Sequence, residues 1–194
     1  FDAGLVYNSH KILPYCPRCG TELSTHEVSD EYKEIDVNSV YVPFKVKGKD
    51  EYFLVWTTTP WTLMANVALC VNPNEKYVKV DSKGYKFIMA AALVEEVLGE
   101  DTEVVEEYVG KDLEGIEYEQ LLPFIKVNGK AFIVTCDEYV TMEDGTGIVH
   151  IAPAFGADDN RVCVNYGIEF VNPVGLDGRY TEGPWQGRLV TETE

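Results

Sequence analysis

The feature that most constrains the fold of this chain is a succession of short β-type segments separated by turn sequences. The segment VYVPFKV (residues 40–46) alternates along the chain in the manner of a strand. The segment EYFLVWTTT (51–59) is rich in β-branched and aromatic residues, and only KGKD separates the two. A short turn that contains glycine, placed between two such runs, predicts a β-hairpin.

Further segments of the same character follow and are separated by turn sequences such as NPNE, SKG and EDG. They are VALCVNP (67–73), YVKVD (77–81), YKFIMA (85–90), EVVEEYV (103–109), FIVTCDEYV (132–140) and GIVHIAP (147–153). Two short helices are expected at ALVEEVLG (92–99) and DDNRVCVNYG (158–167), with Asp158 or Asp159 capping the second. The pattern predicts a mostly-β or α+β fold, with a β-barrel core and short peripheral helices.

Length and composition fit a globular domain with a small appendage. The chain has 194 residues, of which 45% are hydrophobic, enough for a sizeable core. The one candidate boundary lies near residue 35, which divides the chain into residues 1–35 and a main domain over 36–194. Because the sequence opens at FDAGLVY without a methionine, we expect a fragment of a longer protein.

The charge and the absence of long apolar runs exclude several classes of function. With 33 acidic and 16 basic residues the formal net charge is -17, which opposes nonspecific binding to nucleic acid. No apolar run approaches the ~20 residues that span a bilayer, and the first residues do not resemble a signal peptide. We therefore expect a cytoplasmic protein with no membrane partner.

Cysteine usage indicates a reducing compartment and one metal-type motif. Cys70, Cys136 and Cys163 lie in apolar segments and are expected to be buried. Cys16 and Cys19, in CPRCG, have the spacing that presents two thiolates to one zinc ion. A structural zinc site needs four ligands, so we interpret the pair as a half-site that is empty in this chain alone; His10 and His26 are the nearby groups that could complete it. A redox CxxC is less favoured because no βαβ pattern surrounds it.

The first candidate binding segment is WTTTPWTLMAN (56–66). Side chains alternate along a strand, so Thr57 and Thr59 are expected on one side and Thr58 on the other. Pro60 cannot donate to a sheet ladder and ends the strand, which places Trp61 and Thr62 in a loop. Hydroxyls beside an aromatic ring form a small pocket, although strand-forming threonines and core tryptophans explain the segment equally well when it is taken alone.

The second candidate segment is GTGIVHIAPAFGADD (145–159). It combines a strand-like core that contains His150 with two carboxylates, Asp158 and Asp159, just beyond it. Taken alone, His150 could be a hydrogen-bonded core histidine and both aspartates could be helix caps.

The two segments together resemble the editing domain (the CP1 insertion) of isoleucyl-tRNA synthetase, a class I aminoacyl-tRNA synthetase. The resemblance also includes GLVY, YCPRCGTELSTHEV, YKEI and VGLDGRYTE, and so covers nearly the whole chain. The related enzymes for leucine and valine have an arginine-containing counterpart after the first threonines, so TPWT favours the isoleucine enzyme. One departure is Met64, where the family commonly has proline.

The resemblance implies post-transfer editing, the hydrolysis of valine wrongly esterified to tRNA(Ile). The implied partners are the valine-bearing 3′ end of tRNA(Ile) and the remainder of a synthetase that ligates isoleucine with ATP at another site. Residues 1–35 would belong to a zinc-ribbon-like stem at the entry to the insertion. Asp159 would pair with the α-ammonium group of the substrate, a charge pair that carboxylates make well, and His150 would contact the substrate side chain and ester.

The resemblance assigns further residues to the pocket. Thr58 and Thr59 would hold the terminal adenosine, with Thr57 beside them, and Trp61 and Asn66 would line the neighbouring loop. Editing would need no cofactor, because an aminoacyl ester is already activated and an oriented water can attack it. Zinc remains possible in the whole enzyme. The alternatives are an editing domain of a valyl- or leucyl-tRNA synthetase, a noncatalytic tRNA-binding module, and a zinc-binding or redox protein.

Overall fold

The computed structural model describes residues 3, 5–6, 11–16, 18–29, 36–100 and 102–192. Within them the strands are β1 (Tyr15–Cys16), β2 (Thr21–Glu22), β3 (Val40–Lys45), β4 (Tyr52–Thr57), β5 (Ala68–Val71), β6 (Lys76–Ser82), β7 (Tyr85–Ala90), β8 (Glu103–Val109), β9 (Ile133–Cys136) and β10 (Ile148–Ile151). The helices are α1 (Thr25–Ser29), α2 (Val94–Leu98), α3 (Gly110–Leu113) and α4 (Ala157–Tyr166), with 3₁₀ helices η1 (Pro60–Ala65), η2 (Ala91–Leu93) and η3 (Val190–Glu192).

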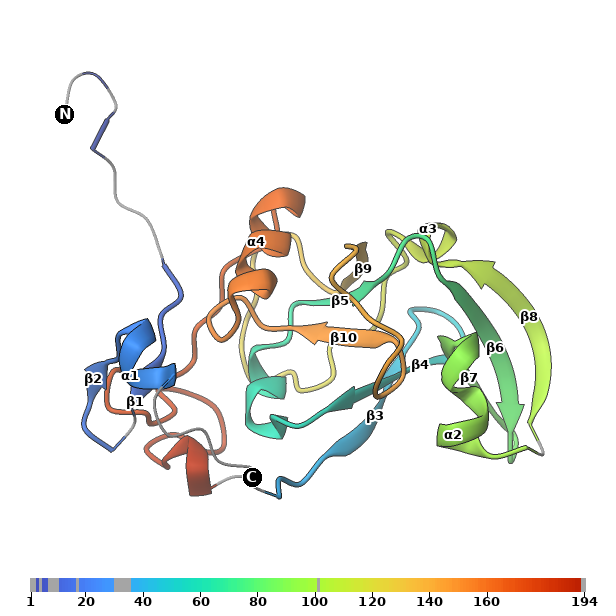
Figure 1. Cartoon of the computed structure of the whole chain (residues 1–194), viewed down its shortest axis with the longest axis horizontal. Coiled ribbons are helices and arrows are strands. Elements are labelled where there is room, and N and C mark those ends of the chain that lie inside the picture. Colours follow the sequence, from blue (N-terminus) through green and yellow to red (C-terminus); the bar gives the residue numbers. More distant parts are fainter. Residues whose placement is uncertain are drawn as a thin grey trace.

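The larger sheet has five strands in the order β3-β4-β7-β6-β8. Strands β3 and β4 pair antiparallel from Val40↔Thr57 to Lys45↔Tyr52, which confirms the predicted hairpin. Strand β4 then pairs parallel to β7, and the remaining neighbours are antiparallel. In Figure 1 this sheet extends from the middle of the molecule to the side farthest from the N-terminus.

The smaller sheet carries one half of the pocket described below. Its order is β10-β5-β9, in which β10 is antiparallel to β5 and β5 is parallel to β9. The register places His150 opposite Leu69. Strand β10 packs beside β4 of the larger sheet, and α4 follows β10 and lies over this end of the molecule (Figure 1).

The core consists of two hydrophobic clusters. One lies between the sheets and contains fully buried side chains such as Phe44, Phe53 and Tyr77. The other joins β5 and β10 to α4 and the C-terminal loops, and includes Met64 and Cys163. Burial of this apolar surface is the main stabilising contribution to such a fold.

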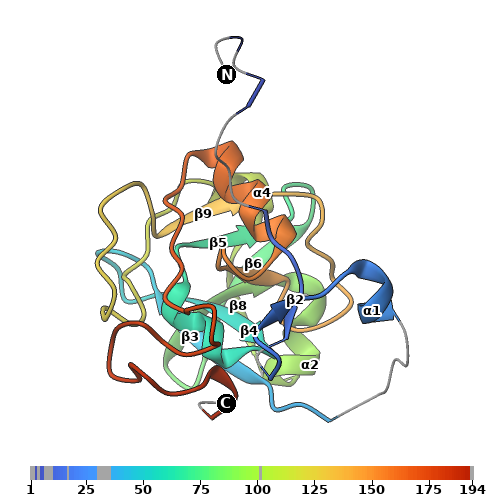
Figure 2. The same cartoon turned by 90° about the vertical axis from the view of Figure 1, so that its left-hand side faces the viewer.

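The N-terminal elements β1, β2 and α1 lie to one side of the main body, next to the C-terminal loops (Figures 1 and 2). Strands β1 and β2 form a separate two-stranded sheet. The division between residues 1–35 and 36–194 falls where residues 30–35 lie outside the described ranges, and it stays a prediction.

The mostly-β prediction with short peripheral helices is confirmed, and each of the predicted strand segments contains a strand. Among the described residues the main strands form separate five- and three-stranded sheets rather than one closed ring. The predicted cap of α4 is wrong, because Gly156 is the N-cap and no side chain caps the helix. No helix of the described part of the chain is long and apolar enough to span a membrane.

Candidate functional site

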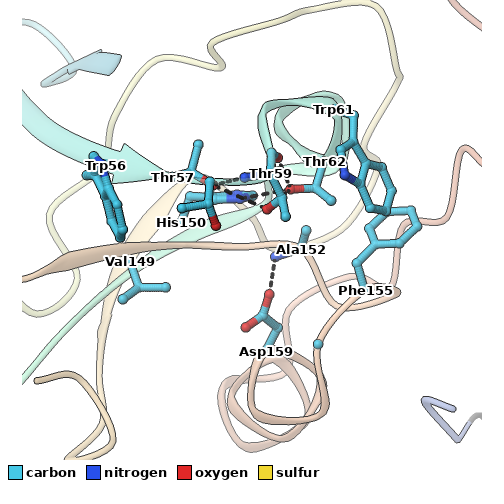
Figure 3. Close-up of a pocket in the computed structure, with 12 residues that line it drawn as sticks. Trp56, Thr57, Thr59, Trp61, Thr62, Val149, His150, Ala152, Phe155 and Asp159 are labelled. Carbon is cyan, nitrogen blue, oxygen red and sulfur yellow. Dashed lines mark hydrogen bonds between the residues drawn. The ribbon is translucent and has the colours of Figure 1, made fainter. Parts of the chain in front are cut away.

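A pocket of about 330 Å³ opens where the end of β4, the turn of η1, strand β10 and the first turn of α4 meet. Its walls bring together the two segments singled out in the sequence (Figure 3). The lining residues are Trp56, Thr57, Thr58, Thr59, Trp61, Thr62, Val149, His150, Ala152, Phe155, Gly156 and Asp159.

The threonines form a connected cluster of hydroxyl groups on one wall. Strand β4 ends at Thr57 and η1 begins at Pro60, so the intervening residues turn back on themselves. Thr57 Oγ1 lies 3.2 Å from Thr59 Oγ1 and accepts a hydrogen bond from the Thr59 amide at 3.1 Å. Thr59 Oγ1 lies 3.3 Å from Thr62 Oγ1. Thr57 and Thr59 therefore share one side, as predicted, while Thr58 is exposed at the pocket.

His150 joins this cluster from β10. Its Nε2 lies 2.9 Å from Thr62 Oγ1, and the side chain is only 7% exposed. Burial lowers the pKa of His150 to about 4, since a charged ring loses hydration there. The imidazole is therefore neutral at pH 7. Its Nδ1 is buried and has no hydrogen-bond partner among the described residues.

Asp159 faces the pocket from the first turn of α4. Its Oδ2 accepts a hydrogen bond from the amide of Ala152 at 2.9 Å (Figure 3). Burial raises the pKa of Asp159 from 3.8 to about 6, and the Ala152 amide opposes this rise only in part. A Cβ at Gly156 would lie 2.9 Å from Asp159 Cγ, so the carboxylate needs glycine there. The result is a half-buried anion without a cationic partner in the described part of the chain.

Asp158 has a different environment although it is the neighbouring residue. Its carboxylate pairs with Arg161 at 2.9 Å on the exposed side of α4. Arg161 also binds Asp137 at 2.6 Å. Asp158 does not line the pocket, so of the two aspartates only Asp159 is available to a molecule bound there.

Aromatic side chains close the two ends of the pocket. Trp61 and Phe155 pack edge to face, with ring centroids 5.0 Å apart. Trp56 lies at the other end beside Val149 (Figure 3). The backbone of Gly145 presses on Trp56: a Cβ there would lie 2.7 Å from the indole, and the φ of +73° favours glycine.

The structure separates Asn66 from the other predicted site residues. Its side chain is buried away from the pocket, donating to the Ala68 carbonyl at 2.8 Å and accepting from Tyr118 Oη at 2.6 Å. Asn66 ends η1 and turns inward, so the structure does not bring it to the pocket wall, and its assignment to substrate binding stays a prediction. Met64 is also in the core and does not line the pocket.

Sequence reasoning missed Thr62 as a site residue. Thr62 lies three residues after Thr59, which is one turn of a 3₁₀ helix and so returns its side chain to the same side. That spacing was visible in TTTPWT once a helical turn was expected after Pro60. Phe155 was also missed, and no sequence signal distinguished it from a core aromatic.

The cysteine pair forms a tight turn between β1 and β2. The Cys19 amide donates to Cys16 Sγ at 3.4 Å, and this contact lowers the pKa of Cys16 while that of Cys19 is raised. No group of three or more His, Cys, Asp or Glu side chains that could hold a metal ion occurs among the described residues. His10 lies outside them. Two thiolates alone do not fit a structural zinc site.

Comparison with known proteins places the chain in a family. No protein-family model matches it. The chain is 48% identical to an isoleucine–tRNA ligase of Clostridium kluyveri over 196 aligned residues, covering 100% of this chain and 19% of that protein. An isoleucine–tRNA ligase of Picrophilus torridus is also 48% identical, over 99% of this chain and 19% of the relative. The chain thus spans about a fifth of the length of these relatives.

A solved structure has the same fold. The crystal structure of GlLeuRS-CP1 superposes with a TM-score of 0.62 over 80% of this chain and 90% of that one, at 15% sequence identity. This likeness shows the fold alone. The sequence identity to the ligases over the full chain carries the assignment, and this chain belongs to the isoleucine–tRNA ligase family.

Proposed function

We propose that this chain is the editing domain of an isoleucine–tRNA ligase and hydrolyses the ester of valine wrongly attached to tRNA(Ile). The observation that carries the proposal is the half-buried Asp159 carboxylate, which faces the threonine cluster across a pocket in a chain of this family. Isoleucine ligation with ATP would occur elsewhere in the longer protein.

Asp159 supplies the anchor for the amino acid. An aminoacyl ester carries an α-ammonium group, and a carboxylate in a partly desolvated pocket binds such a group strongly. Burial raises the pKa of Asp159, and no cationic side chain pairs with this carboxylate among the described residues. A bound ammonium group would provide one and would lower that pKa again.

The opposite wall would sort side chains by size. Valine lacks one methylene of isoleucine. In an apolar pocket this difference is worth about 1–3 kcal/mol, and isoleucyl-tRNA synthetase is the standard example of that general magnitude. A synthetic site cannot strongly reject the smaller side chain, so a second site must accept it. Thr59 and His150, which line the pocket, would exclude the larger one, since close-packed walls tolerate an added methylene poorly.

The hydrolytic step would use a water held against the ester by the hydroxyl cluster. Thr59 lines the pocket while bonded to the other threonines, so its orientation is fixed. An aminoacyl ester needs orientation of the nucleophile more than a covalent intermediate. Thr58, exposed at the mouth, would contact the terminal adenosine.

The test compares deacylation of valyl-tRNA(Ile) and isoleucyl-tRNA(Ile) by a full-length ligase that carries this segment. Replacing Asp159 by Ala should weaken substrate positioning by about 2–4 kcal/mol, because the ammonium group loses its partner. The matched control is Asp158→Ala, whose carboxylate lies outside the pocket and should matter little. Equal rates for the two variants would refute the assignment of the anchor, and a wild-type ligase that leaves valyl-tRNA(Ile) intact would refute the function.

The alternative functions predict different outcomes in the same assay. A leucyl- or valyl-specific editing domain would hydrolyse a different mischarged tRNA. A noncatalytic tRNA-binding module would leave every ester intact while the full-length ligase still bound tRNA.

A further inference from the structure

The hydroxyl of Thr62 lies within hydrogen-bond distance of three other polar atoms. Thr62 Oγ1 is 2.8 Å from the carbonyl oxygen of Thr59, 2.9 Å from His150 Nε2 and 3.3 Å from Thr59 Oγ1 (Figure 3). A hydroxyl has one proton and two lone pairs. Thr62 Oγ1 can therefore donate to one of its three neighbours and accept from the other two, and this limits where the protons of the cluster lie.

The single proton of Thr62 belongs to the bond with the Thr59 carbonyl. A carbonyl oxygen can only accept, and two oxygens 2.8 Å apart require a proton between them. Threonine in a helical turn commonly donates back to a carbonyl three or four residues earlier in this way. Both lone pairs of Thr62 Oγ1 consequently face His150 Nε2 and the Thr59 hydroxyl.

This arrangement fixes the tautomer of His150. Because Thr62 can only accept from the ring, Nε2 must carry the proton. The ring is neutral at pH 7, with a pKa lowered by burial to about 4, so it has one N–H only. The unprotonated nitrogen is then Nδ1, the atom that is buried without a partner among the described residues.

The same constraint orients Thr59. Its hydroxyl donates to the second lone pair of Thr62, and Thr57, whose oxygen already accepts from the Thr59 amide, donates to Thr59 Oγ1. The hydroxyl protons thus run in one direction, from Thr57 through Thr59 to Thr62. Thr59 Oγ1 therefore has one lone pair left, and this lone pair can accept a hydrogen bond from a group in the pocket.

We infer that Thr62 is a positioning residue, which holds His150 as the Nε2–H tautomer and makes the Thr59 hydroxyl an acceptor toward the pocket. Thr59 Oγ1, as an acceptor, receives a hydrogen bond from a bound water and leaves the lone pairs of the water oxygen free to face an ester carbon. The tautomer is independent of the proposed function, whereas this kinetic role rests on it.

The tautomer is tested by ¹⁵N NMR of the chain labelled at its histidine rings, because protonated and unprotonated ring nitrogens have well-separated shifts. The chain has three histidines, and the His150 signals are assigned by their loss in His150→Gln. We expect a protonated Nε2 and an unprotonated Nδ1 in the wild type and in Thr62→Ser. Thr62→Val, which has nearly the same shape and no hydroxyl, should change the ¹⁵N shift of Nε2, because the N–H loses its acceptor. A wild type protonated at Nδ1, or a Thr62→Val spectrum identical to the wild type, would overturn the inference.

The kinetic role is tested with full-length ligase variants. Thr62→Val should lower kcat for valyl-tRNA(Ile) deacylation by about tenfold, the effect of one misdirected hydrogen bond, with KM changed less than about twofold. Thr62→Ser should restore kcat. The matched control is Thr135→Val, which removes a buried threonine hydroxyl bonded to the Leu69 carbonyl outside the pocket. An equal loss of kcat in Thr62→Val and Thr135→Val, or failure of Thr62→Ser to restore it, would refute the role. An inactive wild type would instead refute the proposed function and leave the NMR result standing.

Discussion

Replacing Asp159 by Asn should stabilise the fold at neutral pH while it removes the carboxylate that we propose as the anchor for the substrate. Asn keeps the shape of the side chain and an oxygen that can accept from the Ala152 amide at the observed 2.9 Å. It removes a charge that burial disfavours. The residue would therefore be one at which a functional group is retained at the expense of stability.

The magnitude follows from the pKa. Burial raises the pKa of Asp159 from 3.8 to about 6, and one pKa unit corresponds to about 1.4 kcal/mol, so the ionised side chain destabilises the fold by at most ~3 kcal/mol. Because the carboxylate is half-buried and partly screened by solvent, we expect ~1–2 kcal/mol.

The sign of the pH dependence is fixed by the direction of the shift. Between pH 3.8 and about 6 the folded protein binds more protons at Asp159 than the unfolded chain does. The contribution of this group to stability is therefore greatest below pH 3.8 and is lost as the pH rises through about 6. The Asn variant should gain relative to wild type above pH 6 and lose that advantage toward pH 4.

Urea denaturation at pH 8, 6 and 4 measures this difference directly as the change in the free energy of unfolding. Asp158→Asn is the control, since it removes the neighbouring carboxylate from an exposed ion pair with Arg161 and should change stability by less than about 1 kcal/mol. An Asp159→Asn variant no more stable than wild type at pH 8, or an advantage that is the same at pH 4, would show that the carboxylate is not destabilised by burial.

Three further outcomes are expected. Trimming the pocket wall by Thr59→Ala or His150→Ala in the full-length ligase should raise the deacylation rate of isoleucyl-tRNA(Ile) relative to that of valyl-tRNA(Ile). An unchanged ratio in both variants would show that other residues exclude the isoleucine side chain. Tyr118→Phe should lower the free energy of unfolding by about 1–3 kcal/mol in denaturant titration, because the buried oxygen of Asn66 loses its donor; no change would mean that water or another group replaces it. The chain alone should lose zinc on dialysis against a mild chelator, since CPRCG provides two thiolates of four ligands, and stoichiometric retention would show that another group completes the site.

Local patterns predicted the strands because each strand is short, alternating or β-branched, and ended by a turn. The β3–β4 hairpin follows from seven residues on one side, four of turn and a β-rich run on the other. The parallel pairs β4–β7 and β5–β9 could not be predicted in this way. Parallel neighbours are joined by long connections, so nothing in either strand identifies its partner.

Strand alternation predicted which threonines share a side, whereas the positions of two side chains in and after η1 could not be predicted from it. Thr57 and Thr59 were placed together from the alternation of a strand, and the structure bears this out. Thr62 and Asn66 both lie in or at the end of η1, where strand alternation no longer applies and the turn sends one side chain to the pocket and the other to the core.

Under the proposed function, the composition of the pocket would explain how an acidic domain serves a nucleic-acid substrate. None of the described lining residues is Lys or Arg, and the one charged group there is Asp159. An anionic site in a chain of net charge -17 repels phosphates. It attracts the ammonium group that an esterified amino acid carries, and a tRNA end without an amino acid lacks that group. The pocket would therefore recognise the aminoacyl end, and an empty 3′ end would gain nothing from Asp159 and be released. Affinity for the rest of the tRNA would have to come from other parts of the ligase, since phosphate binding and recognition of the amino acid call for opposite charges.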